Sequence, residues 1–241
     1  MQVAEYLAQL EDDGVRLADV AVALDAEVPP CPRWTVRDLV THIGGVHRWA
    51  ASIVRDRLDH DPAPRDEDLA TPGSRDPVEW FRDGHAELLA TLRKADPDLR
   101  CYAFLPAPSP LTFWARRQAH ETAIHRADAE SAFGAITPFP ASFAADGIDE
   151  MINGFGGRRR SFRYVNSPRT LAVSPADAEG WTITLAPDGV RSTRGVAAAH
   201  ATISGSASEL YLWLWNRPAT VVVAGDPDVP ALWRNVRVRW S

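Results

Sequence analysis

A glutamate and a histidine four residues apart, Glu121 and His125, lie in a segment with the apolar spacing of an inward-facing helix. At about 100° per residue their side chains are about 40° apart on one helix face. Ala123 and Ala127 fall on the opposite side, which we expect to face outward. A carboxylate on an inward face is strongly destabilising unless it is paired or bound to a metal ion. The pattern therefore predicts a partner for Glu121.

The residues themselves leave two interpretations of this pair. Arg117 precedes Glu121 by four residues, the spacing of an ordinary ion pair on a solvated helix face. Alternatively, Glu121 and His125 bind one side of a divalent metal ion, and a third ligand comes from elsewhere in the chain. The candidates are His42 and His47, which are about 140° apart around another predicted helix. Helical geometry alone leaves the choice between them open.

Composition excludes several classes of protein. The formal charge of −6 argues against a dedicated nucleic-acid binder. No run approaches the roughly 18 apolar residues of a membrane span. The N-terminus lacks the basic and apolar segments of a signal peptide, so we expect a cytoplasmic protein.

Cys31 and Cys101 lack the spacing of a metal finger or redox motif, and we expect two unpaired thiols. A thiol used in the chemistry would then arrive on a cosubstrate.

The first half of the chain has the periodicity of amphipathic helices. Thr35, followed three residues later by Asp38, has the pattern of a helix N-cap. Four helices of this size predict a four-helix bundle, in whose core neighbouring helices contribute side chains to a common metal site. The predicted helices are residues 3–24, 36–58, 77–93 and 111–133.

The second half changes to the shorter period of strands. Pro187–Gly189 is typical of a hairpin turn. Together the two halves predict an α+β protein, with a helical domain over residues 1–155 and a small mixed α+β domain over residues 156–241. The predicted elements of the second half are a helical piece at 141–155, strands at 170–173, 181–185, 199–203 and 220–224, and a helix at 206–215.

Three segments together resemble a known family. Trp34–His42 and Phe113–Asp128 resemble the maleylpyruvate isomerase family of mycothiol-dependent enzymes, which belongs to the DinB-like superfamily of metal-binding four-helix bundles. Gly205–Pro218 resembles the C-terminal domain of that family, which is similar to sterol-carrier folds. The resemblance covers nearly the whole chain. It implies a DinB-like bundle followed by a sterol-carrier-like domain.

The resemblance also implies which residues bind the metal ion. The family has a histidine eight residues after a tryptophan that begins the second helix, and Trp34 plus eight is His42. With Glu121 and His125, this histidine would bind zinc or another divalent metal. His47 would then line the pocket or support a ligand. Three protein ligands leave a coordination position open, as in catalytic sites.

Other residues match the family pattern less directly. Arg217 matches an arginine that is thought to help hold the thiol cosubstrate, although it would equally suit the C-terminal end of a helix. Asp128 matches a recurrent position and would hold a helix end or orient a metal ligand. His120 is expected to point away from the metal.

The implied function is a zinc-dependent enzyme that uses mycothiol, a low-molecular-weight thiol, as a nucleophile against an electrophilic small molecule. The outcome would be cis–trans isomerisation of a maleylpyruvate-like compound, or S-transfer of the thiol to the electrophile. A metal-dependent hydrolase is the first alternative, and it needs a nearby general base. A non-catalytic module that binds a ligand or regulates a partner is the second. Neither a nucleic acid nor a membrane is expected as a partner.

Overall fold

The computed structural model describes residues 1–62, 71–156 and 166–234. The chain divides into two compact units, residues 1–137 and 138–241. The predicted α+β class is confirmed, because a helical unit precedes a unit with a five-stranded mixed sheet. The division falls before residue 141, so the helical piece predicted at residues 141–155 lies in the second unit. Residues 157–165, just past the predicted boundary, lie outside the described residues.

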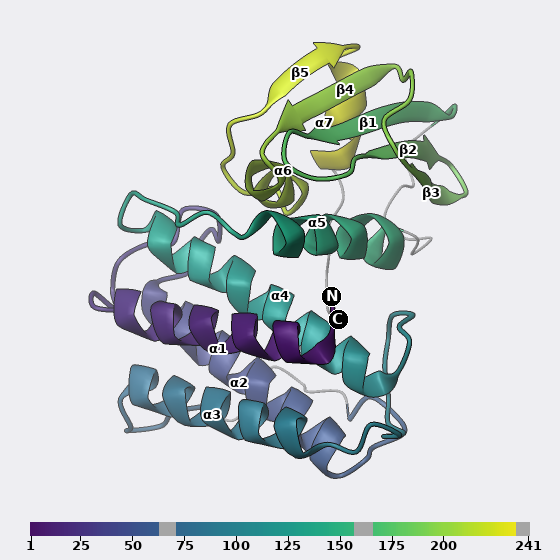
Figure 1. Ribbon diagram of the computed structural model, residues 1–241. Coiled ribbons are helices and arrows are strands. Elements are labelled where there is room, and N and C mark those ends of the chain that lie inside the picture. The colour runs from purple at the N-terminus through teal and green to yellow at the C-terminus, as the bar shows by residue number, and fades with distance from the viewer. Residues whose placement is uncertain (63–70, 157–165, 235–241) are drawn as a thin grey trace. The chain divides into compact units, whose positions relative to one another are not determined.

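The first unit is the predicted bundle of four long helices (Figure 1). Helices α1 and α2 each pack against both α3 and α4. Among the described residues, no helix is long and apolar enough to cross a membrane. The helices are α1 (Val3–Val20), α2 (Val36–Arg55), α3 (Pro77–Lys94) and α4 (Pro110–Ser131).

Short polar side chains fix where these helices begin. Thr35 caps α2, and Asp38 returns a carboxylate to the Thr35 backbone N–H, as the sequence predicts. Asp76 and Ser109 cap α3 and α4, and each is followed by a proline at the first helical position. Helix α2 ends three residues earlier than predicted, because Arg57 adopts a left-handed conformation (φ 52°) that stops the helix.

Helix α4 is buried around almost its whole circumference, which the sequence does not predict. Ala123 and Ala127, expected on the outward side, are buried. Helix α1 covers that side: its Tyr6 packs edge-on against His120, and its Asp13 pairs with Arg126 at 3.0 Å. The small alanine side chains allow α1 to approach closely. Glu121 consequently lies in the interior and not on a solvated face.

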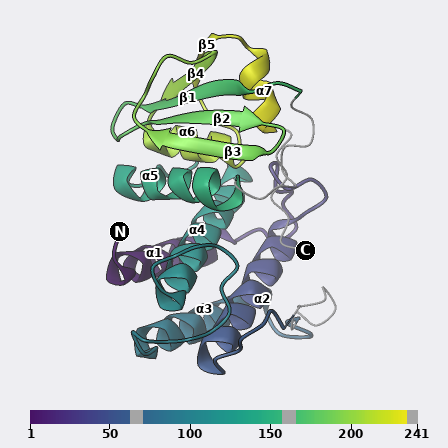
Figure 2. The same cartoon turned by 90° about the vertical axis from the view of Figure 1, so that its right-hand side faces the viewer.

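The second unit contains a five-stranded sheet with the strand order β3-β2-β1-β4-β5 (Figure 2). β1 and β4 pair in parallel, and the other neighbours are antiparallel. Helices α6 and α7 both contact β1 and β4. The elements are α5 (Ala141–Asp149), a π-helical turn η1 (Glu150–Phe155), β1 (Arg169–Pro175), β2 (Trp181–Ala186), β3 (Gly189–Arg194), β4 (Ala201–Gly205), α6 (Ala207–Leu214), β5 (Val222–Gly225) and α7 (Asp228–Arg234).

The hairpin turn predicted at Pro187–Gly189 is confirmed, since it joins β2 to β3. Two elements of this unit have no prediction from the sequence. β3 is an edge strand with a largely polar sequence and little burial, so it lacks the alternation that marks a half-buried strand. Helix α7 is short, and a long-range contact holds it: the Trp233 indole N–H donates to the Leu214 carbonyl at 2.9 Å.

Two histidines lie in the interior of the bundle, and neither forms an ion pair with any residue that the structure describes. His47 is fully buried, and its Nε2 lies 2.8 Å from the Thr122 hydroxyl. His85 lies beside it, with ring centroids 5.5 Å apart, and bonds the Leu10 carbonyl. Burial holds the pKa of His47 well below its usual range and lowers that of His85. Both rings are therefore neutral in the folded protein near neutral pH.

These two histidines should make the fold sensitive to acid. The unfolded chain binds protons at both rings below about pH 6.5, whereas the folded chain does not, so stability falls as the pH drops. A ring that stays neutral in the folded protein, as that of His47 does, contributes a slope of about 1.4 kcal/mol per pH unit. We expect His47→Leu to reduce the slope between pH 6.5 and 5 by about that amount in urea unfolding.

His60→Leu is the control for loss of an imidazole outside the core, because the His60 side chain is exposed. The slope should fall by more in His47→Leu than in this control. An identical slope in His47→Leu and the unsubstituted protein would contradict the assignment of His47 as a buried neutral base.

Candidate metal centre

The structure brings together three of the residues singled out from the sequence: His42 on α2, and Glu121 and His125 on α4. One donor atom from each lies within 4.8 Å of the other two. Both helices are held in register nearby by the His47–Thr122 hydrogen bond. The geometry thus favours His42 over His47 as the third member of the cluster.

The Glu121 carboxylate is almost completely buried, at 2% exposure. Its Oε2 accepts a hydrogen bond from the Arg117 guanidinium at 2.8 Å, so the ion pair predicted from their spacing forms, but in the interior. Its Oε1 lies 3.3 Å from His125 Nε2 and 3.9 Å from His42 Nε2, and no described residue donates a hydrogen bond to it. A buried carboxylate oxygen without a donor is costly, and a cation among these three atoms would remove the cost.

The other ring nitrogen of His125 has a carboxylate partner. His125 Nδ1 lies 3.1 Å from Asp128 Oδ2, within one turn of α4. With the proton on Nδ1, the Nε2 lone pair faces Glu121 Oε1 and is available to a metal ion. Carboxylates commonly orient metal-binding histidines in this way. The role predicted for Asp128, to orient a ligand, fits this contact.

Cys31 also contacts Asp128, which the sequence does not indicate. Its thiol donates to the same oxygen, Asp128 Oδ2, at 3.5 Å. The two residues are 97 positions apart, so no local pattern connects them. Among the described residues, neither Cys31 nor Cys101 forms a disulfide, as predicted. Burial raises the pKa of the Cys101 thiol, which disfavours the thiolate there.

A short connection before α2 provides an aromatic wall to the cluster. Consecutive turns link Val28, Cys31 and Trp34 through backbone hydrogen bonds of 2.9 Å. They place the Trp34 ring 4.9 Å from the His42 ring and in a stacked orientation 6.3 Å from the His125 ring. The indole therefore restricts both imidazoles on one side.

Neighbouring charged groups favour the ionised forms of Glu121 and His125, although both side chains are buried. For Glu121, burial alone would raise the pKa, but His125, His42 and the Arg117 guanidinium together hold it well below its usual range. For His125, burial acts to lower the pKa, yet the Asp128 and Glu121 carboxylates raise it to about 9. Without a metal ion, Glu121 is therefore ionised and His125 is protonated near neutral pH. A metal ion would take the place of a proton between them.

Two imidazoles and one carboxylate suit zinc and several other divalent first-row metals. The His42 side chain is 25% exposed, whereas Glu121 and His125 are nearly inaccessible. Any open coordination position would therefore be reached from the His42 side. The arrangement has the ligand number of a catalytic site rather than a structural one.

The remaining predicted residues lie elsewhere. His120 contacts Tyr6 of α1, away from the cluster, as expected. In the second unit, Arg217 follows α6, and its backbone N–H donates to the Leu212 carbonyl at 2.9 Å. Its guanidinium donates to the Trp215 carbonyl at 3.0 Å. These contacts are those of a helix C-terminus, and the thiol-binding role of Arg217 stays a prediction.

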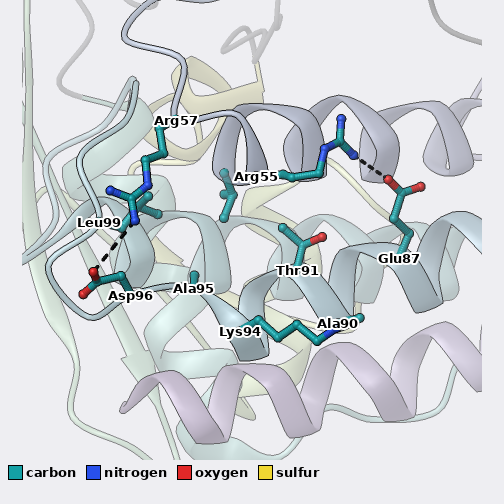
Figure 3. Close-up of a pocket in the computed structure, with 10 residues that line it drawn as sticks. Arg55, Arg57, Glu87, Ala90, Thr91, Lys94, Ala95, Asp96 and Leu99 are labelled. Carbon is teal, nitrogen blue, oxygen red and sulfur yellow. Dashed lines mark hydrogen bonds and ion pairs between the residues drawn. The ribbon is translucent and has the colours of Figure 1, made fainter.

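A cavity of about 390 Å³ lies between the C-terminal halves of α2 and α3. It is not part of the cluster, because Val54 in its wall lies roughly 18 Å along α2 from His42 at 1.5 Å per residue. Figure 3 shows two ion pairs among its charged side chains, Arg55 with Glu87 at 2.7 Å and Arg57 with Asp96 at 3.8 Å. The chemistry of the three-residue cluster is the stronger indication of function.

Comparisons identify proteins similar to this chain. The family model described as the mycothiol maleylpyruvate isomerase N-terminal domain matches residues 7–130, and the C-terminal domain model of that family matches residues 142–232. A crystal structure of the mycothiol-dependent maleylpyruvate isomerase is 14% identical, with a TM-score of 0.63 and 93% of each chain covered. A histidine-to-alanine mutant of that enzyme is 13% identical, with a TM-score of 0.64 and the same coverage. The comparison with curated proteins finds no match.

The Asp128 contact predicts how a metal ion would depend on it. In Asp128→Asn the side chain keeps its size but loses its charge, so the Nδ1 proton of His125 is held less firmly. We expect metal affinity about 10- to 100-fold lower, measured by competition with a chelating indicator.

Asp13→Asn is the matched control, since Asp13 is an equally buried carboxylate of the bundle that pairs with Arg126 instead. Its folded form should bind metal like the unsubstituted protein. Equal affinities in Asp128→Asn and the unsubstituted protein would show that Asp128 does not support a ligand.

Proposed function

Because the chain belongs to the maleylpyruvate isomerase family of mycothiol-dependent enzymes, we propose that it uses mycothiol as a nucleophile against an electrophilic small molecule at a metal centre formed by His42, Glu121 and His125. The observation that carries the proposal is Glu121 Oε1. This oxygen is buried, accepts no hydrogen bond and faces two imidazole nitrogens. Zinc is the metal we expect, by resemblance to the family.

When bound, a divalent metal with an open position favours the deprotonated form of a thiol and so supplies a nucleophile at neutral pH. The protein's own residues prepare the site. In the metal-bound state His42 and His125 would act as neutral nitrogen donors, and Glu121 would contribute one negative charge. Asp128 holds the His125 proton at Nδ1. Trp34 covers one side of both imidazoles and limits the entry of water there.

The reaction we favour is isomerisation of a cis double bond conjugated to a carbonyl group, as in maleylpyruvate. The thiol sulfur adds to one alkene carbon, the remaining single bond rotates, and expulsion of the sulfur restores the double bond in the trans form. No atom is gained or lost, and the thiol is regenerated. If the adduct persists, the same first step is a transfer of the thiol to the electrophile.

A hydrolase is the runner-up, and it needs a general base that is not a ligand. Among the described residues, Asp128 is the carboxylate beside the cluster, and it already bonds His125 and Cys31. This engagement disfavours hydrolysis. A non-catalytic binding module remains the third candidate. The location in the cytoplasm and the thiol contact of Arg217 are further parts of the proposal, and both rest on the sequence.

Metal content and thiol dependence test the proposed function together. Elemental analysis of the purified protein should find close to one zinc per chain. A double variant, His42→Ala with Glu121→Ala, should contain none while keeping the helical bundle. Turnover of a maleylpyruvate-like substrate should require both the metal and the thiol.

Different results would separate the alternatives. Metal-dependent turnover of an ester or amide without any thiol would favour the hydrolase. Carefully prepared protein that contains no metal and takes up none when zinc is added would overturn the catalytic proposal and leave a binding module.

A further inference from the structure

Helix α4 contains two buried arginine–glutamate pairs with the same spacing. Arg117 donates to Glu121 at 2.8 Å, and Arg126 donates to Glu130 at 2.6 Å, each four residues along the helix. Both arginines are almost inaccessible, at 0% and 1% exposure. The Arg126–Glu130 pair therefore serves as an internal comparison for the Arg117–Glu121 pair.

The two glutamates differ in how fully their oxygens are satisfied. Glu130 Oε2 accepts from Arg126 and from the Thr137 backbone N–H, and its Oε1 accepts from the Thr137 hydroxyl. This pair is complete by itself and ties the end of α4 to the following connection. In the first pair only Oε2 of Glu121 is hydrogen-bonded, and Oε1 faces the imidazoles of His42 and His125 without a donor.

The orientation of the Glu121 carboxylate thus depends on Arg117. The guanidinium keeps its positive charge when buried, and it occupies the oxygen that points away from the imidazoles. A carboxylate held in this way presents a single oxygen to the cluster. Without the arginine, both oxygens would be free to turn toward a metal ion.

We propose that Arg117 is a positioning residue that restricts Glu121 to one metal-binding oxygen and thereby keeps a coordination position open for the thiol. The inference rests on the proposed metal centre and adds a determinant of its coordination number. Arg117 also adds a positive charge beside the centre, which favours binding of an anionic ligand. It acts through Glu121 and has no assigned contact with the substrate.

Cobalt(II) is a suitable probe, because its visible absorption changes with coordination number and a bound thiolate adds an intense near-ultraviolet band. The metal-free protein is titrated with Co²⁺, and the loaded protein is then titrated with 2-mercaptoethanol. The variants are Arg117→Met, which removes charge and hydrogen bonds, and Arg117→Gln, which keeps a donor without the charge. Arg126→Met is the matched control for loss of a buried arginine from α4.

In Arg117→Met we expect Co²⁺ to bind at least as tightly as in the unsubstituted protein, because the metal becomes the cation that satisfies both oxygens. The visible bands should weaken as the coordination number rises. Binding of 2-mercaptoethanol should weaken about tenfold or more, since the positive charge next to Glu121 has been removed. Opposite changes in metal and thiol affinity are not expected from a residue that only stabilises the fold.

Arg126→Met should lower stability while its folded form keeps both affinities and the spectrum. If Arg117→Met does not fold, Arg117→Gln decides the matter, with thiol binding weakened in the same direction. Thiol affinity and spectrum that are unchanged in the folded Arg117 variants, or metal and thiol affinities that fall together, would overturn the inference. Failure of the unsubstituted protein to bind Co²⁺ would instead overturn the proposed metal centre itself.

Discussion

The burial of one carboxylate, that of Glu121, is the constraint on which the site depends. A charged group at 2% exposure is tolerated only when the surroundings replace its water. Arg117 does this for one oxygen, and two imidazole nitrogens face the other without forming hydrogen bonds to it. Removing either side would leave an uncompensated charge in the interior, a change that typically costs several kcal/mol. A metal ion fits beside Glu121 Oε1, the oxygen to which no described residue donates a hydrogen bond.

Burial of Glu121 follows in turn from the packing of α4. Helix α2 covers one side of α4, and α1 covers the side where Ala123 and Ala127 allow close approach. The same packing directs His42 toward the cluster and His47 toward Phe81 and His85, where its ring is neutral. Fold and site are therefore set by the same contacts.

Local patterns in the sequence predicted much of this structure. The Glu121–His125 pair and its arginine follow from helical spacing, and the four helices follow from their periodicity. Helical geometry alone could not decide whether His42 or His47 is the third ligand, because that depends on how α2 packs against its neighbours. Contacts between distant residues, such as Cys31 with Asp128, left no local signal. Edge strand β3 was missed because exposed strands lack the apolar alternation that identifies buried ones.

The most direct test is a crystal structure of the zinc-loaded protein with anomalous diffraction recorded at the zinc edge. We expect one strong peak within about 2.0–2.2 Å of His42 Nε2, Glu121 Oε1 and His125 Nε2, with Arg117 still on Glu121 Oε2. A peak that involves His47 in place of His42, a peak elsewhere on the chain, or no peak at saturating zinc would contradict the metal centre.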